Sequence, residues 1–236
     1  VHIRTAEIVA LYSYVSLGEM FNTAALNGDV VNSQIYVFGV YSNLQADTDL
    51  TNSALLSPFL SYSPPLGPAA LVSSTGTITL DNTLTAGTPQ FNVEVTYTGP
   101  GGAWAGDATK TLTVGARVRV WYPYSTFMFS SDATLNTITG YNDPANCARL
   151  KYQRAELKVI TQWSDGVSRL PDMDVTREVT FASTDNTVVS LAGLRGDPWV
   201  DGLSAGTVDI SIQGAAPGIP TVALELDVSD TPVTET

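Results

Sequence analysis

Residues 116–121 read Ala116-Arg117-Val118-Arg119-Val120-Trp121, and their apolar and polar side chains alternate one by one up to Val120. The same alternation appears in Val208-Asp209-Ile210-Ser211. Successive side chains of a β-strand point to opposite faces of a sheet, so this period indicates antiparallel strands with one buried and one solvated face. Similar stretches recur at residues 34–41, 76–80, 91–97, 156–161, 178–181, 207–212 and 222–226.

Turn signals separate these stretches, as in Asn27-Gly28-Asp29, Gly99-Pro100-Gly101-Gly102 and Asp165-Gly166. No segment sustains the apolar period of an amphipathic helix over three turns. Eight or more short strands in 236 residues are typical of β-sandwiches of roughly 100 residues each. The sequence therefore predicts an all-β protein of two tandem immunoglobulin-like (bacterial Ig-like) β-sandwich domains.

The domain boundary is predicted at Trp121-Tyr122-Pro123-Tyr124, because a proline ends a strand that would need its backbone amide. Residues 1–122 then form domain 1, whose N-terminal strand is a candidate for exchange with a neighbour, and residues 123–236 form domain 2. A weak internal repeat favours two similar units, since Asp49-Leu50-Thr51 recurs as Asp174-Val175-Thr176.

Charge and composition exclude several classes of function. The chain is 44% hydrophobic but only 14% charged, and its net charge is −12. Nucleic acid is a poor partner, because phosphate binding needs clustered lysine and arginine. Basic residues nevertheless crowd the middle of the chain, either as a solvated strand face or as a surface that meets the acidic front half of another copy. These are Arg117, Arg119, Arg149, Lys151, Arg154 and Lys158.

The cysteine content and the hydropathy of the chain bear on where in or outside the cell the protein is found. Cys147 is the only cysteine, so no internal disulfide forms. A free buried thiol is the favoured interpretation, with an intermolecular disulfide or a reactive thiol as the alternatives. No run of about 18 apolar residues occurs, so no membrane span is expected. Val1 opens directly on strand-like sequence, without a charged segment followed by an apolar core, so no signal peptide is expected in this numbering. We expect an extracellular or cell-surface protein.

Several segments resemble the transmembrane protein 132 family. The likeness covers about residues 5–212, and its most specific part is Cys147 to Val159. The other matching segments are 6–11, 19–28, 118–123, 135–141, 174–176 and 206–207. The resemblance implies tandem bacterial-Ig-like domains in an extracellular, adhesion-type protein without a catalytic motif.

This chain departs from that family in two respects. The family carries a cysteine pair in the region that corresponds to residues 50–72, where this chain has no cysteine and a proline-rich stretch instead. The family's membrane anchor and cytoplasmic tail have no counterpart in these residues, so receptor signalling is not implied.

Candidate chemistry is sparse, and we expect no enzyme and no cofactor. The single histidine, His2, lies at the N-terminus, a poor place for the oriented base of a triad. Two acidic pairs stand at strand spacing and are weak calcium candidates, because side chains at i and i+2 share a face. The alternative is that they hydrogen-bond their own backbone in turns. The pairs are Asp47 with Asp49 and Asp172 with Asp174.

Aromatic side chains offer two interpretations. They are either core anchors of the sandwiches or a carbohydrate platform. Trp104 is the exception, because glycines surround it and predict an exposed hairpin tip that makes contacts. The others are Trp121, Trp163, Trp199, Tyr122, Tyr124, Phe127 and Phe129.

The predicted function is that of a non-catalytic extracellular subunit that self-associates end to end into a filament or surface appendage, because terminal strands leave unpaired edges. The alternatives are a cell-adhesion ectodomain that binds another surface protein and a carbohydrate-binding module. No Asn-x-Ser/Thr sequon occurs, whereas the stretch 57–68 is an expected exposed polyproline-like loop that could bear O-linked sugar. Predicted interface residues are Ile3, Ile8, Leu11, Trp104, Val222, Leu224 and Leu226, and predicted glycosylation sites are Ser61, Ser63, Pro64, Pro65 and Pro68.

Overall fold

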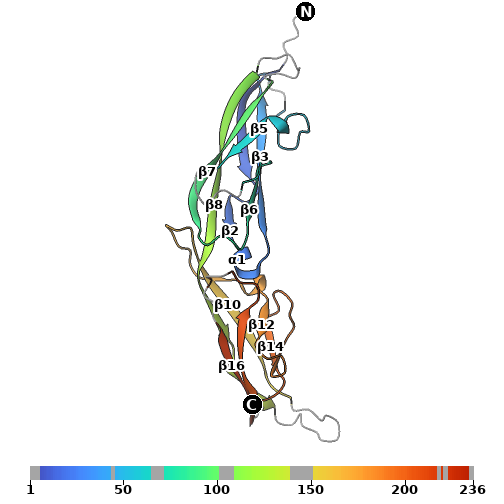
Figure 1. Ribbon diagram of the computed structural model, residues 1–236, viewed down its shortest axis with the longest axis vertical. Helices are drawn as coiled ribbons and strands as arrows, with labels where there is room; N and C mark the ends of the chain where they lie inside the picture. Colours follow the sequence, from blue (N-terminus) through green and yellow to red (C-terminus); the bar gives the residue numbers. More distant parts are fainter. Residues whose placement is uncertain are drawn as a thin grey trace, which may run out of the picture. The chain divides into compact units, whose positions relative to one another are not determined.

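The computed structural model describes residues 6–43, 46–64, 72–100, 109–138, 151–216, 219 and 223–233. Nearly all regular structure in these residues is β, so the all-β prediction is confirmed (Figure 1). The contacts of the chain divide it into two units, and each is an immunoglobulin-like sandwich of two sheets. Unit 1 comprises residues 1–22, 30–121 and 165–168, and unit 2 comprises residues 23–29, 122–164 and 169–236.

Unit 1 has a first sheet in which β3 is central and a second sheet that contains the hairpin of β7 and β8. In the first sheet, β3 pairs with β1, β4 and β6. In the second, β8 pairs antiparallel with β7 and parallel with β2, and β7 pairs with β5. The strands are β1 Ile8–Val15, β2 Glu19–Phe21, β3 Val31–Tyr41, β4 Thr48–Asp49, β5 Leu60–Ser63, β6 Thr77–Leu80, β7 Thr88–Pro100 and β8 Thr109–Ser130, with the 3-10 turn η1 at Ser57–Phe59.

Unit 2 repeats this plan. The C-terminal part of β8 pairs with β10, which also pairs with β11 and β14, and β14 pairs with β13. The second sheet has the order β12-β15-β16-β9, with β9 parallel to β16. The elements are α1 Ala24–Asn27, β9 Thr134–Ile138, β10 Arg154–Ser164, β11 Met173–Asp174, η2 Thr176–Glu178, β12 Phe181–Ser183, β13 Val189–Leu191, β14 Trp199–Gly202, β15 Gly206–Ile212 and β16 Leu224–Val233.

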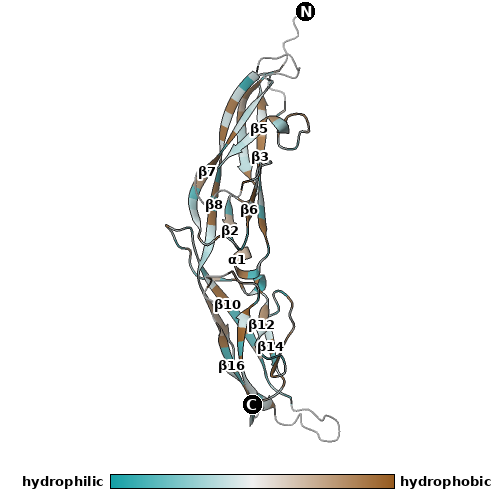
Figure 2. Cartoon of the chain, viewed as in Figure 1, coloured by the Kyte–Doolittle hydropathy of each residue, from teal (hydrophilic) through white to brown (hydrophobic). Residues whose placement is uncertain are grey.

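Alternating side chains build the cores. In β3, Ile35 and Val37 are fully buried, and from the other sheet of unit 1 Val93, Val95 and Val118 pack into the same core. Figure 2 shows hydrophobic and hydrophilic residues alternating along the strands of both units. This is the pattern of sheets with one face in the core, as the sequence predicts.

Two short segments belong to one unit although the residues before and after them in the chain belong to the other. Helix α1 is part of unit 2, and it ends at Gly28, whose φ of +80° suits a glycine C-cap. The turn 165–168 is part of unit 1. There the buried Asp165 carboxylate accepts the backbone N–H groups of Val167 and Ser168, and it lies 3.6 Å from Arg119. Burial opposes ionisation of Asp165, but these partners outweigh it and lower its pKa.

The structure corrects two expectations about local structure. Residues 57–63 are not an extended proline-type loop, because they form η1 and β5, and β5 pairs with β7. The terminal strand β16 is not a sheet edge, because β15 and β9 pair with its two sides. Residues 224–228 of β16 pair with β15 and residues 227–233 pair with β9, so a further copy could add only where one side of β16 is unpaired. No helix among the described residues is long and apolar enough to cross a membrane.

Candidate functional site

The predicted acidic pairs are engaged in local hydrogen bonds. Asp49 accepts the backbone N–H of Asn52 at 3.1 Å, and Asp174 accepts the N–H and the hydroxyl of Thr176 at 3.0 and 2.7 Å. The hydroxyl, the N–H and Lys158 lower the pKa of Asp174. Asp172 accepts a bond from Gln162. The bonds of Asp49 and Asp174 are the turn geometries of the alternative interpretation, and no cluster of three His, Cys, Asp or Glu occurs among the described residues.

Four of the predicted interface residues lie in the described part of the chain. Ile8 and Leu226 are buried, and Leu11 and Leu224 are half-buried. Ile8 and Leu226 therefore contribute to packing within their own units and not to a free surface. Ile3, Trp104 and Val222 lie outside the described residues, as do His2 and Cys147.

The predicted glycosylation sites lie on or beside β5. Ser61 and Ser63 are exposed on this strand, and Pro64 follows it. Pro65 and Pro68 lie outside the described residues.

The predicted aromatic residues divide into core and surface. Trp121 and Trp163 are fully buried, as anchors of their units. Trp199 is 41% exposed, and the guanidinium of Arg154 lies 5.5 Å from its ring centre. Tyr124, Phe127 and Phe129 on β8 are about half exposed.

The surface of unit 1 carries a row of stacked aromatic rings that the sequence did not single out. We call Tyr12, Tyr14, Tyr36 and Phe38 the aromatic row. Tyr12 stacks on Phe38 at a centroid distance of 5.0 Å, Tyr14 on Tyr36 at 4.9 Å, and Tyr14 on Phe38 at 5.9 Å, all with nearly parallel planes. Tyr12 and Tyr14 are 42% and 50% exposed. Such exposed aromatic patches mark interaction sites.

Strand pairing explains why these rings meet. Strands β1 and β3 are antiparallel, with Tyr12 opposite Phe38 and Tyr14 opposite Tyr36. Ile35 and Val37 occupy the inner face of β3, so Tyr36 and Phe38 must face outward. Directly opposed side chains are close enough to pack, and the aromatic row is the result.

The electrostatic surroundings of the aromatic row are acidic. Strands β1, β3, β4 and β6 contain no lysine or arginine. Asp49 pairs with Phe38 across β4 and β3. Partial burial and the hydrogen-bonded Asp47 carboxylate raise the pKa of Tyr12. Neither Asp47 nor Asp49 has an ion-pair partner in the described part of the chain.

Unit 2 contains the same backbone arrangement, and the recurring Asp-x-Thr motif fixes the correspondence. The Val37 N–H donates to the Thr51 hydroxyl at 2.8 Å, and the Val159 N–H donates to the Thr176 hydroxyl at 2.9 Å. Asp49 lies opposite Phe38, and Asp174 lies opposite Ile160. The two motifs therefore occupy equivalent places.

This register extends to the exposed aromatics. Phe127 lies opposite Ile160 and Phe129 opposite Lys158, as Tyr12 lies opposite Phe38 and Tyr14 opposite Tyr36. Phe127 and Phe129 are thus the counterparts of Tyr12 and Tyr14. We call the exposed Tyr124, Phe127 and Phe129 the unit 2 aromatic face.

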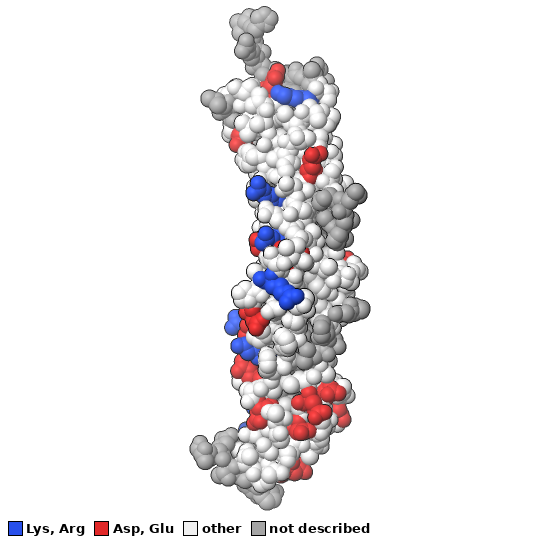
Figure 3. All heavy atoms as spheres, turned by 90° about the vertical axis from the view of Figure 1, so that its left-hand side faces the viewer, with Lys and Arg blue, Asp and Glu red and all other residues white. Residues whose placement is uncertain are grey.

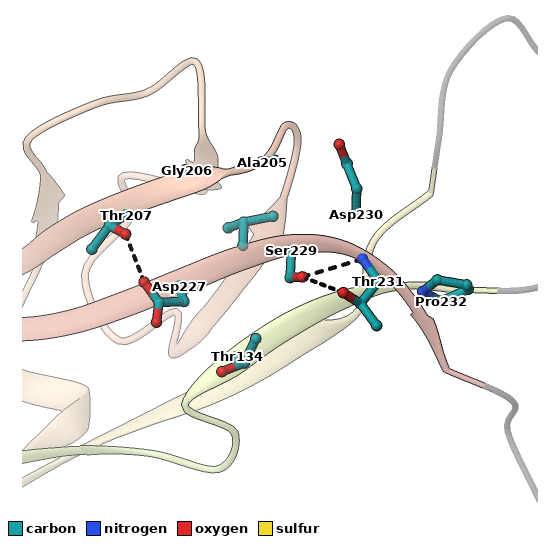
Figure 4. A pocket seen from close by; sticks show the side chains of 10 residues that line it. Thr134, Ala205, Gly206, Thr207, Asp227, Ser229, Asp230, Thr231 and Pro232 are labelled. Atoms are coloured by element: carbon teal, nitrogen blue, oxygen red, sulfur yellow. Dashed lines mark hydrogen bonds between the residues drawn. The ribbon is translucent and has the colours of Figure 1, made fainter.

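A polar hollow in unit 2 is a further feature that could hold a ligand (Figure 4). Thr207 donates to Asp227 at 2.7 Å, and Ser229 donates to Thr231 at 3.0 Å. Figure 4 shows Asp230 pointing away from Asp227, and Tyr152 donates a hydrogen bond to Asp230. The two carboxylates therefore do not converge on a common cation.

Charged side chains are thinly spread over the surface. Figure 3 shows a face that is mostly uncharged, with acidic side chains gathered over unit 2. Unit 2 carries 15 acidic and 7 basic residues of the sequence, against 8 and 4 in unit 1. The acidic excess therefore lies mainly in the second unit and not in the front half of the chain.

No protein-family model and no curated protein matches the chain. Among solved structures, similar chains include domains 1–6 of the surface layer protein SbsC, with 17% identity and a TM-score of 0.34 over 99% of this chain and 29% of that one. The Yersinia pseudotuberculosis adhesin InvE has 13% identity and a TM-score of 0.29 over 95% of this chain and 60% of that one. Mouse cadherin-23 EC22-24 has 11% identity and a TM-score of 0.26 over 97% and 67%.

The chain thus spans less than a third of the SbsC structure and less than two thirds of the adhesin. At these TM-scores the likenesses assign no function.

Proposed function

We propose that the chain is a non-catalytic extracellular structural subunit that associates end to end with further copies of itself, into a filament or surface appendage. The observation that carries the proposal is the aromatic row on the outer face of unit 1. Exposed tyrosines supply large contact areas and are enriched among residues that dominate binding. The extracellular location rests on the family resemblance and on the low charge content.

The state of the carboxylates supports binding rather than catalysis. Asp49 and Asp174 accept hydrogen bonds from their own turns. Asp165 is held by two backbone N–H groups beside Arg119. Carboxylates held in this way serve the local fold and are poorly placed to exchange a proton with a substrate.

The stacking in the aromatic row favours a protein partner over a sugar. Phe38 contacts both Tyr12 and Tyr14, and Tyr14 contacts Tyr36. A saccharide ring stacks on a free aromatic face, whereas these rings cover part of one another. A cell-adhesion ectodomain that binds a different surface protein would use the same aromatic row. In that case the purified chain alone would stay monomeric.

Sedimentation velocity over a concentration series tests the proposal. We expect the wild-type chain to form larger species as concentration rises at near-neutral pH. The double substitution Tyr12→Ser with Tyr14→Ser should weaken this association at least tenfold, which corresponds to about 1.4 kcal/mol. Leu55→Ser is the matched control, because Leu55 is 82% exposed and lies outside the aromatic row.

A wild-type chain that remains monomeric at every concentration would contradict self-association. Equal loss of association in the control and the double variant would show that the aromatic row is not the contact. Circular dichroism of each variant checks that the sandwich fold is retained.

A further inference from the structure

Strand β1 is an edge of the first sheet of unit 1, because β3 is the one strand that pairs with it in the described part of the chain. Its residues, Ile8–Val15, include no charged residue and no proline. Natural sheets usually protect an edge with lysine, proline, a bulge or a covering segment, because unpaired N–H and C=O groups attract further strands. The bulge of β1 lies at its start, between Ile8 and Ala10, so the rest of the strand offers a regular edge.

The bonding of β3 shows which backbone groups of β1 point to the open side. The N–H and the C=O of Val37 are bonded at 2.8 Å each to residues 51 and 50, on the side of β3 away from β1. Ser13 lies opposite Val37, so its own backbone groups point away from β3. Bonded pairs alternate along an antiparallel ladder, so Leu11 and Val15 do the same. These three residues have no backbone hydrogen-bond partner in the described part of the chain.

We propose that β1 of one copy pairs antiparallel with β1 of a second copy, about a two-fold axis at Ser13. In this register Ser13 faces the same residue of the other copy, and Leu11 of each copy faces Val15 of the other. All three outward-pointing residues of each strand then have a partner, and each bonded pair exchanges two hydrogen bonds. A register shifted along the strand would leave some of these groups unpaired.

The side chains of β1 select a second copy of the same strand as the occupant. On the outer face, Tyr12 of one copy lies opposite Tyr14 of the other, at the closely spaced non-bonded positions where side chains pack against each other. On the inner face, aliphatic Leu11 meets aliphatic Val15, and Ser13 meets Ser13. Every position is therefore matched in kind, and the aromatic row continues from one copy into the other.

Charge does not oppose this pairing at the edge itself. Glu7, the acidic residue next to β1, lies 3.9 Å from Lys110 of its own copy. Asp49 pairs with Phe38 across β4 and β3, on the side of β3 away from the edge. No charged side chain of one β1 therefore lies directly opposite a like charge of the other.

The edge contact goes beyond the proposed function and is compatible with it. Edge pairing uses the backbone of β1, whereas the proposed end-to-end contact uses the outer face of the aromatic row. A two-fold contact uses the same surface on both copies, so it closes a pair and does not propagate. It joins two copies through one continuous sheet and leaves the outer faces free.

Charge substitution on the axis tests this register, because residue 13 faces itself only there. Ser13→Lys opposes two cations, and Ser13→Asp opposes two anions. Like charges directly opposite each other destabilise strand pairing. We expect each variant alone to pair at least about tenfold more weakly than the wild type in sedimentation velocity. An equimolar mixture should recover pairing, because mixed pairs place a cation opposite an anion.

Matched controls make the same changes away from β1. Ser61 is exposed on β5, in the second sheet of unit 1. Ser61→Lys and Ser61→Asp should leave association unchanged, alone and mixed. Thermal unfolding of all four variants establishes that each is folded.

Hydrogen exchange on the unaltered chain is the second measurement, since the Ser13 variants also lose the hydrogen bond from the Ser13 hydroxyl to the Gly115 C=O. The amides that point to the open edge should gain protection as concentration rises. These belong to Leu11, Ser13 and Val15. The amides of Tyr12 and Tyr14 point to β3 and should be protected at every concentration.

The outcomes separate the edge contact from the proposed function. Ser13 variants that pair as tightly as the wild type, or folded variants whose mixture does not recover, would overturn the edge contact and leave end-to-end association standing. A wild type that stops at pairs, and loses them on Ser13→Lys, supports the edge contact and overturns the filament. A wild type that is monomeric at every concentration would overturn both.

Discussion

Unit 1 and unit 2 share a topology and a strand register. The outer faces of their equivalent sheets nevertheless carry different side chains. Tyr12 and Tyr14 correspond to Phe127 and Phe129, while Tyr36 and Phe38 are replaced by Lys158 and Ile160. The core positions behind them, Val37 and Val159, are the same residue and equally buried. The comparison shows that packing fixes the inner face, whereas the outer face is free to differ and so to carry function.

The largest expected effect concerns the motif residues that point into the cores. Leu50 is fully buried and Val175 nearly so. Leu50→Ala should lower the free energy of unfolding by about 2–5 kcal/mol, through lost burial and a residual cavity. Val175→Ala removes fewer methyl groups and should cost less. Chemical denaturation measures both, and a larger loss for Val175→Ala would break the proposed equivalence.

A second comparison concerns the threonine of each motif. Thr51→Val and Thr176→Val leave the buried N–H groups of Val37 and Val159 without an acceptor. Each should cost about 1–3 kcal/mol, and the two values should be similar. Hydrogen exchange should localise each loss to the unit concerned.

Thr111→Val is the control for these substitutions, since Thr111 is exposed on β8. It should change stability little. A loss confined to one of the two motifs would mean that the hydroxyls have different roles.

The dependence of stability on pH sharpens the comparison of the two units. The Thr83, Thr176 and Thr187 hydroxyls and backbone N–H groups lower the pKa values of Asp81, Asp174 and Asp185. A folded pKa below the unfolded value of about 4 stabilises the fold above that pH. The stabilisation is lost as pH falls through the folded pKa values. We expect unfolding free energy to decrease below about pH 4.

Thr176→Val should flatten this acid dependence, because it raises the folded pKa of Asp174 toward its ordinary value. Denaturation at pH 7 and at pH 3 measures the change. An acid dependence identical to that of the wild type would contradict the assigned cause.

The smallest expected effect on the free energy of unfolding comes from substitution of a single exposed aromatic residue. Tyr12→Ser removes a ring stacked on Phe38 and should cost about 0.5–1.5 kcal/mol. Phe127→Ser removes a ring opposite Ile160 and should cost about 0.2–1 kcal/mol. Thermal unfolding of dilute protein checks both. Losses above about 3 kcal/mol would show that these side chains belong to the core and not to a contact surface.

The sequence predicted the strands because one face of each is apolar, as in Val118 and Val120 of β8. It also revealed the repeat, because Asp-x-Thr is a local hydrogen-bonding pattern that the structure shows at equivalent places. The domain limits, the exchange of the N-terminal strand, the glycosylation sites and the likeness to the transmembrane protein 132 family stay predictions.

The aromatic row escaped the sequence analysis for a physical reason. Residues 35–38 of β3 are apolar on both faces, so their periodicity does not say whether Ile35 and Val37 or Tyr36 and Phe38 face the core. Only the packing of the opposite sheet decides this. The sequence did contain one indication of the aromatic row: Tyr12 and Tyr14 stand two residues apart, as do Tyr36 and Phe38.

Electron microscopy of the purified wild-type chain, at micromolar concentration and near-neutral pH, tests the central claim most directly. End-to-end association of successive copies predicts linear assemblies whose repeat is one copy. Isolated single particles under these conditions, or closed pairs alone, would contradict it.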